Sequence, residues 1–112
     1  MKRISILIPE RAILGSLEGS RQMLVQVNDF LRIQGREPAF DVKLVGLTGE
    51  TRLFNGLYTL HAEQLIHEIG KTDLIIIPAL EGNIQHALEL NKAYIPWITA
   101  QHKKGAEVAS LC

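Results

Sequence analysis

The sequence predicts an α/β fold: a doubly wound parallel sheet with helices on both faces. Four apolar runs are nearly continuous and rich in β-branched residues, which is typical of strands buried on both faces. Helical patterns separate these runs, and strands that alternate with helices form parallel sheets through right-handed crossovers. Because 46% of the 112 residues are hydrophobic, the chain can build the core that such a sheet requires.

The predicted strands cover residues 3–8, 40–45, 73–77 and 107–111. We expect them to pair in the parallel order 2-1-3-4. After the second strand, Asn55-Gly56 stands between apolar pairs, which is the strongest short-range hairpin signal. The sequence therefore predicts a hairpin over residues 53–58 that sits apart from the main sheet.

Four helices are predicted between and around these strands. The first covers residues 21–34 and ends at Gly35, and its apolar stripe is expected to be buried. The second covers residues 61–69, and the third covers residues 83–91. The fourth begins near Pro96, which suits a first turn, and ends at Gly105. The stripe of the first helix consists of Met23, Leu24, Val27, Phe30 and Leu31.

Composition argues against several classes of protein. The net charge is zero and no basic cluster exceeds Lys103-Lys104, so the basic surface of a DNA-binding domain is missing. No apolar run reaches the roughly 20 residues that span a bilayer, so no membrane partner is predicted. One cysteine offers no disulfide framework and fits the reducing cytoplasm. The four histidines and the glycines match no metal-ligand or phosphate-loop spacing, so we predict no metal and no cofactor.

The carboxyl ends of the strands are the expected ligand-binding edge. Doubly wound sheets bind ligands there, near a topological switch point. Residues 9–19, residues 78–83 and Cys112 each leave such an end. We expect the three segments to converge on one crevice.

Four segments occur in the order and spacing of a known family: residues 6–9 (ILIP), 17–21 (LEGSR), 73–78 (DLIIIP) and 108–112 (VASLC). The chain resembles the PfpI-like domain of the class I glutamine amidotransferase-like superfamily. The resemblance is closest to the N-terminal sensor domain of AraC-type transcriptional regulators. It implies a flavodoxin-like fold, commonly dimeric, with a nucleophile elbow at Cys112. Residues 1–112 then form the front part of one such domain, incomplete at its C-terminal end, and the DNA-binding helix-turn-helix region is absent.

The resemblance also names two residues for catalysis, Cys112 and Glu18. Glu18 is expected in the loop after the first strand, where family members carry an acid that faces the elbow cysteine. Two plainer interpretations stay open: Cys112 is a small buried hydrophobic residue, and Glu18 is a surface glutamate favoured by the helix dipole.

Four further residues are predicted to bind the ligand: Glu10, Glu81, Gly82 and Asn83. Glu10 is also a weaker candidate for the acid. The segment Pro78-Ala79-Leu80 lacks the paired glycines that let backbone N–H groups approach an oxyanion in many enzyme members. This difference favours binding over catalysis.

Three functions remain in competition. The first is a ligand-sensing, dimerising domain of an AraC-type regulator, which contacts DNA only through its missing part. The second is a thiol-dependent hydrolase, amidase or glyoxal-modifying enzyme that uses Cys112. The third is an interaction domain without small-molecule chemistry. Because the end of the sheet is left open, we also expect the chain to pair with a second copy or with the missing part of its domain.

Overall fold

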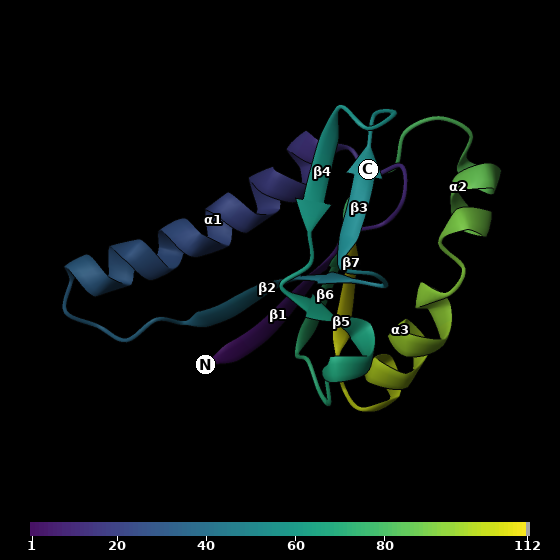
Figure 1. Cartoon of the computed structure of the whole chain (residues 1–112). Helices are drawn as coiled ribbons and strands as arrows, with labels where there is room; N and C mark the ends of the chain where they lie inside the picture. The colour runs from purple at the N-terminus through teal and green to yellow at the C-terminus, as the bar shows by residue number, and fades with distance from the viewer. Residues whose placement is uncertain (112) are drawn as a thin grey trace.

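The computed structural model of the protein describes residues 1–111. Its centre is a five-stranded sheet in the order β5-β2-β1-β6-β7, and every pair in it is parallel (Figure 1). The predicted order of the four main strands is confirmed, with β5 added at one edge. In chain order the elements are β1 (Lys2–Leu7), α1 (Leu14–Ile33), β2 (Phe40–Gly46), β3 (Glu50–Leu53), β4 (Tyr58–His61), β5 (Gln64–Leu65), the 3-10 turn η1 (Ile66–Glu68), β6 (Leu74–Ile77), α2 (Ile84–Leu90), α3 (Tyr94–Lys103) and β7 (Glu107–Ser110).

Two apolar layers cover the sheet, one on each face. Alternate residues of a strand point to opposite faces, so β1 supplies Ile4 and Ile6 to one layer and Leu7 to the other. The first layer packs on Leu17 of α1, and the second packs on Tyr94 of α3. The α/β fold with helices on both faces is therefore confirmed (Figure 1).

The hairpin forms its own two-stranded antiparallel sheet from β3 and β4, apart from the main sheet as predicted. Its turn places Phe54 and Asn55 at φ of 53° and 55°, with the Gly56 N–H bonded to the Leu53 carbonyl at 3.2 Å. Gly56 follows at φ +85°, so three successive residues of the loop between the paired Leu53 and Tyr58 lie in the left-handed region, which Asn and Gly adopt most readily. The Thr51 hydroxyl donates to the Ile8 carbonyl at 3.4 Å, so the hairpin is tied to the loop after β1.

The predicted helix over residues 61–69 is wrong. β4 continues to His61, β5 then pairs with the end of β2, and only the short turn η1 is helical. Glu63 explains the pairing, because its N–H donates to the Leu44 carbonyl and its carboxylate accepts from the Leu44 N–H, at 2.9 and 2.8 Å. The apolar residues of this segment divide between the two faces of the sheet: Ala62 joins the α1 layer, and Ile66 joins the α3 layer.

Helix α1 begins at Leu14, seven residues before the predicted start at 21, and ends as expected at Gly35, whose φ is +73°. Its predicted stripe is not buried: Met23 is 71%, Val27 43% and Phe30 61% exposed, and only Leu24 and Leu31 are half-buried. The cause is position, because the C-terminal part of α1 extends beyond the sheet (Figure 1). Leu17, nearer its start, takes the buried position instead.

The last two helices lie close to their predicted bounds. The Asn83 side chain caps α2 by accepting the His86 N–H at 2.9 Å. Pro96 lies in the first turn of α3, and Gly105 follows this helix at φ +102°. In the part of the chain that the structure describes, no helix is both long and apolar enough to cross a membrane.

Candidate functional site

The loops that follow β1 and β6 lie side by side at the carboxyl edge of the sheet. Ala12 and Leu80 form an isolated antiparallel bridge. Next to it, the Ile13 N–H donates to the Ala79 carbonyl and the Glu81 N–H donates to the Arg11 carbonyl, both at 2.8 Å. Two of the three segments expected at this edge therefore meet, while Cys112 lies outside the described residues.

A cavity of about 430 Å³ opens where the hairpin turn stands next to these two loops. Glu10 and Glu81, both predicted to bind the ligand, line it. Four further side chains line it that the sequence analysis did not assign to a site, namely Arg11, Arg52, Phe54 and Asn55. Arg11 is the neighbour of Glu10, so proximity could have indicated it. Arg52 and Phe54 reach the cavity only because the hairpin folds over the sheet edge, which no local pattern encodes.

Arg11 has an unusual backbone for this site. It is a non-glycine residue with φ +71°, a region that costs roughly 1–3 kcal/mol and is concentrated at functional sites. The surrounding bonds maintain it, because its guanidinium pairs with the Glu81 carboxylate at 3.1 Å. Gly82 supplies the space: a Cβ there would collide with Nη2 of Arg11. Gly82, which was predicted to bind the ligand, thus leaves room for the Arg11 guanidinium.

Arg52 lies over a glycine in the same way. A Cβ on Gly56 would come within 2.7 Å of Nη2 of Arg52, and Gly56 has φ +85°. Both guanidinium groups of the cavity therefore occupy space that a side chain at Gly82 or Gly56 would fill. Asn83, by contrast, uses its side chain to cap α2, so it supports the wall and is not among the residues lining the cavity.

Asn91 and Tyr94 hold the loop after β1 from the α3 side. Asn91 is 8% exposed; its Oδ1 accepts the Glu10 N–H at 2.8 Å and its Nδ2 donates to the Glu10 carbonyl at 2.9 Å. The Tyr94 hydroxyl donates to the Ile8 carbonyl at 2.9 Å and accepts the Leu47 N–H at 3.2 Å. Burial raises the pKa of Tyr94 to about 12. The backbone of Glu10 is thus held in place at the cavity.

Glu18 does not lie in the loop after the first strand, as expected, but inside α1. Because α1 starts at Leu14, Glu18 lies in its second turn. The Glu18 carboxylate accepts from Nε of Arg21 at 2.6 Å, and this hydrogen bond raises the pKa of Arg21. The pairing of Glu18 with Cys112 stays a prediction, because Cys112 is outside residues 1–111.

The segment after Pro78 has already used two of its N–H groups. The Ala79 N–H donates to Oγ of Ser16 at 3.0 Å, and the Glu81 N–H donates to the Arg11 carbonyl. In the enzymes that the resemblance suggests, groups at this place would bind a developing oxyanion. Here these two N–H groups fasten two loops together.

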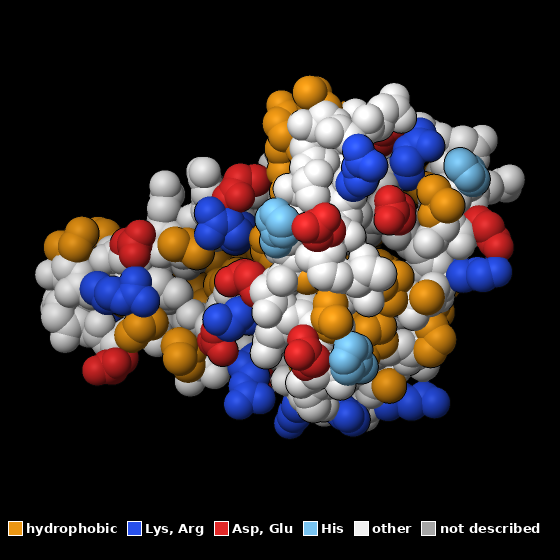
Figure 2. All heavy atoms as spheres, viewed as in Figure 1, with side chains coloured by type: hydrophobic (Ala, Val, Ile, Leu, Met, Phe, Trp, Pro, Cys, Tyr) orange, Lys and Arg blue, Asp and Glu red, His pale blue; other side chains and the backbone are white. Residues whose placement is uncertain are grey.

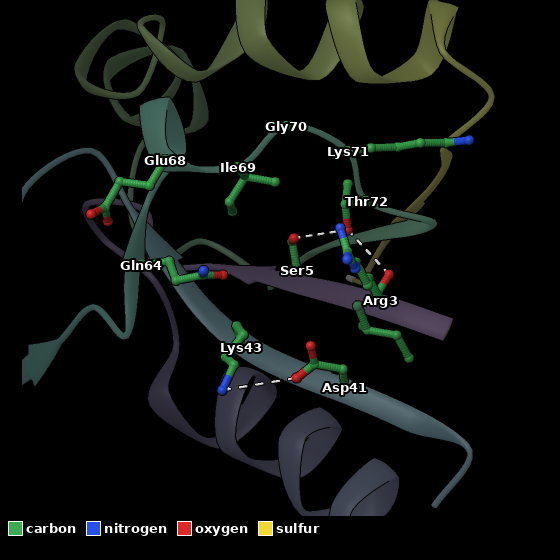
Figure 3. Close-up of a pocket in the computed structure, with 11 residues that line it drawn as sticks. Arg3, Ser5, Asp41, Lys43, Gln64, Glu68, Ile69, Gly70, Lys71 and Thr72 are labelled. Carbon is green, nitrogen blue, oxygen red and sulfur yellow. Dashed lines mark hydrogen bonds and ion pairs between the residues drawn. The ribbon is translucent and has the colours of Figure 1, made fainter. Parts of the chain in front are cut away.

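A second cavity, of about 230 Å³, lies at the amino end of β1 and β2 (Figure 3). Ser5 donates to Oγ1 of Thr72 at 2.9 Å, and Thr72 donates to the Arg3 carbonyl at 3.1 Å. Lys43 and Asp41 pair with one another along its rim at 3.8 Å (Figure 3). These polar groups satisfy each other, and the cavity lies at the opposite end of the strands from the loops that carry the candidate site.

Neither surface charge nor metal-ligand clusters mark another candidate site among the described residues. Figure 2 shows acidic and basic side chains mixed over the visible face, in agreement with the zero net charge. Among the described residues, no group of three His, Cys, Asp or Glu side chains could hold a metal ion.

Comparison with known proteins bears on the fold. No protein-family model and no curated protein matches the sequence. A candidate transcriptional regulator from Vibrio parahaemolyticus matches the structure with a TM-score of 0.76 at 19% identity, over 97% of this chain and 55% of that one. An AraC family transcriptional regulator from Pseudomonas putida gives 0.74 at 16% identity, over 98% of this chain and 55% of that one. Oxidized DJ-1 from Toxoplasma gondii matches with a TM-score of 0.63 at 18% identity, over 100% of this chain and 56% of that one.

The chain therefore has the flavodoxin-like fold of DJ-1/PfpI-like domains, as the sequence resemblance implied, and this fold is shared with AraC-type regulators. It spans just over half the length of each of these three structures. At identities below 20% the likeness establishes the fold and not the chemistry.

Proposed function

We propose that the chain is the ligand-sensing and dimerising domain of an AraC-type transcriptional regulator, with DNA binding carried by another part of the protein. The ligand is a small molecule in the cavity beside Glu10, Arg11, Arg52 and Glu81. The regulator would act in the cytoplasm, where its DNA is found. The Pseudomonas putida regulator supports this choice through its fold, although the same fold also occurs in DJ-1.

One observation carries the proposal. The loops after β1 and β6 are fastened to one another by backbone bonds and by the Arg11–Glu81 pair, so they form a prearranged pocket with charged walls. A concave site with a few convergent polar groups is the usual form of a small-molecule site. The Ala79 and Glu81 N–H groups are already used in this fastening, which supports a binding role over an oxyanion hole.

Two parallel assays test the proposal on the purified chain. Thermal unfolding is followed with a panel of metabolites of differing charge, and thiol-dependent hydrolase and glyoxalase activities are measured alongside, with Cys112→Ser as the control. We expect at least one compound to raise Tm in a concentration-dependent way, by on the order of 10 °C at a hundredfold excess over Kd. We expect no turnover that depends on Cys112. Turnover lost in Cys112→Ser, or a panel without any binder, would overturn the proposal.

A further inference from the structure

The two guanidinium groups of the cavity are not equivalent. Arg11 is already paired with the Glu81 carboxylate at 3.1 Å. Arg52 forms no ion pair with any carboxylate of residues 1–111, although it lines the same cavity. We propose that the cavity selects a small monocarboxylate, whose carboxylate group binds the Arg52 guanidinium. This inference rests on the proposed function and names the chemical class of its ligand.

The backbone under Arg52 is shaped for this role. Gly56 lies directly beneath the guanidinium, with no Cβ to lift it. Nη2, Cζ and Nε of Arg52 all lie within 3.3 Å of the place that such a Cβ would take. A guanidinium without an ion-pair partner keeps its planar fork of donors available, and that fork matches a carboxylate in bidentate geometry. The hairpin loop thus leaves room for the cation and brings no carboxylate of residues 1–111 into an ion pair with it.

The acidic residues set the charge of the ligand. Arg11 and Glu81 cancel one another, which leaves Arg52 as the positive and Glu10 as the negative group of the cavity. Asn91 fixes the backbone of Glu10 at the cavity, because it bonds both its N–H and its carbonyl. A second negative charge on the ligand would approach Glu10, so the site favours a monoanion over a phosphate or a dicarboxylate.

The remaining wall suits an apolar body. Phe54 lines the cavity and is 37% exposed, and Tyr58 holds its ring edge-to-face at a centroid distance of 5.9 Å. An aromatic ring fixed in this way offers apolar area at little entropic cost. The ligand is therefore a carboxylate attached to a small apolar group.

Benzoate, benzamide and inorganic phosphate are the probes for the test. Each is titrated into the ¹⁵N-labelled full chain, and NMR follows the Arg side-chain Nε–Hε signals together with the backbone signal of Gly56. We expect benzoate to shift the Arg52 and Gly56 signals in a saturable way. Benzamide has the same shape without the charge, so it should bind at least tenfold more weakly, and phosphate should also bind more weakly than benzoate.

Variants assign the effect to Arg52. Arg52→Ala and Gly56→Ala should each weaken benzoate binding at least tenfold, the second because its Cβ displaces the guanidinium while the charge remains. Arg36→Ala, at an exposed position outside the cavity, should bind as the parent does. A ¹⁵N NMR spectrum that matches the parent's away from the substituted residue confirms that each variant is folded.

Three results would overturn the inference: equal binding of benzamide, tighter binding of phosphate, or benzoate binding that survives Arg52→Ala. If a neutral or cationic metabolite occupies the cavity without Arg52, the sensor proposal stands and the carboxylate inference fails. If Cys112-dependent turnover is found while benzoate still needs Arg52, the sensor proposal fails and the carboxylate site stands.

Discussion

Replacing Asn91 with alanine tests how strongly the ligand loop depends on α2 and α3. The side chain makes three hydrogen bonds: two with the backbone of Glu10 and one from Nδ2 to the Ala87 carbonyl at 2.8 Å. At a net value of about 0.5–1.5 kcal/mol each, the loss of all three amounts to about 1.5–4.5 kcal/mol. Water can reach the exposed Glu10 and replace part of this, so we expect a loss near the lower end, about 2 kcal/mol.

Urea unfolding followed by the fluorescence of Trp97 measures this loss, since it is the only tryptophan and lies in α3. Asn83→Ala is the matched control, because it removes one cap bond at an exposed position and should cost about 1 kcal/mol. Asn91→Ala should also weaken benzoate binding, whereas Asn83→Ala should not. A free energy of unfolding within about 0.5 kcal/mol of the parent would refute the reasoning, because surface substitutions stay in that range.

Three further outcomes are expected. Because burial raises the pKa of Tyr94 to about 12 from an ordinary value near 10, its neutral form stabilises the fold below pH 10 and this contribution is lost as the pH rises toward 12. Urea unfolding between pH 9 and 12 should show this slope, and Tyr94→Phe should reduce it; equal slopes would contradict the assignment. Gly35→Ala, at φ +73°, should lower the free energy of unfolding by about 1 kcal/mol, whereas Gly49→Ala, which has equal space and no positive φ, should cost less. Met23 and Leu111 line an apolar hollow of about 400 Å³ between α1 and β7, so we expect the chain to self-associate at micromolar concentration. Light scattering measures this self-association, which Met23→Glu should reduce. A monodisperse monomer of the parent chain would contradict the expectation.

Local chemistry explains which parts of the fold could be predicted. β6 is a continuous apolar run and β1 ends in a nearly continuous one, and a run buried on both faces has few alternatives to a central strand. The hairpin at Asn55-Gly56 and the helix end at Gly35 could also be predicted, because each depends on a few residues that adopt positive φ readily.

The segment from 61 to 69 shows where local reasoning fails. Its apolar spacing fits a helix stripe, but the same residues also fit two faces of a sheet edge. The free edge of β2 decided between them, because Glu63 completes a pair of bonds to Leu44 that only the assembled sheet offers. Likewise, the stripe of α1 is apolar in sequence, but the sheet ends before the helix does.

Hydrophobic period and the shared direction of parallel strands were enough to predict the strand order, the helices on both faces and the edge of the sheet where Glu10 and Glu81 meet. Only the tertiary structure decided which cations join them. Arg52 lies in a hairpin more than 40 residues from Glu10 in the sequence, and no local sequence pattern predicts that this hairpin packs beside the Glu10 loop.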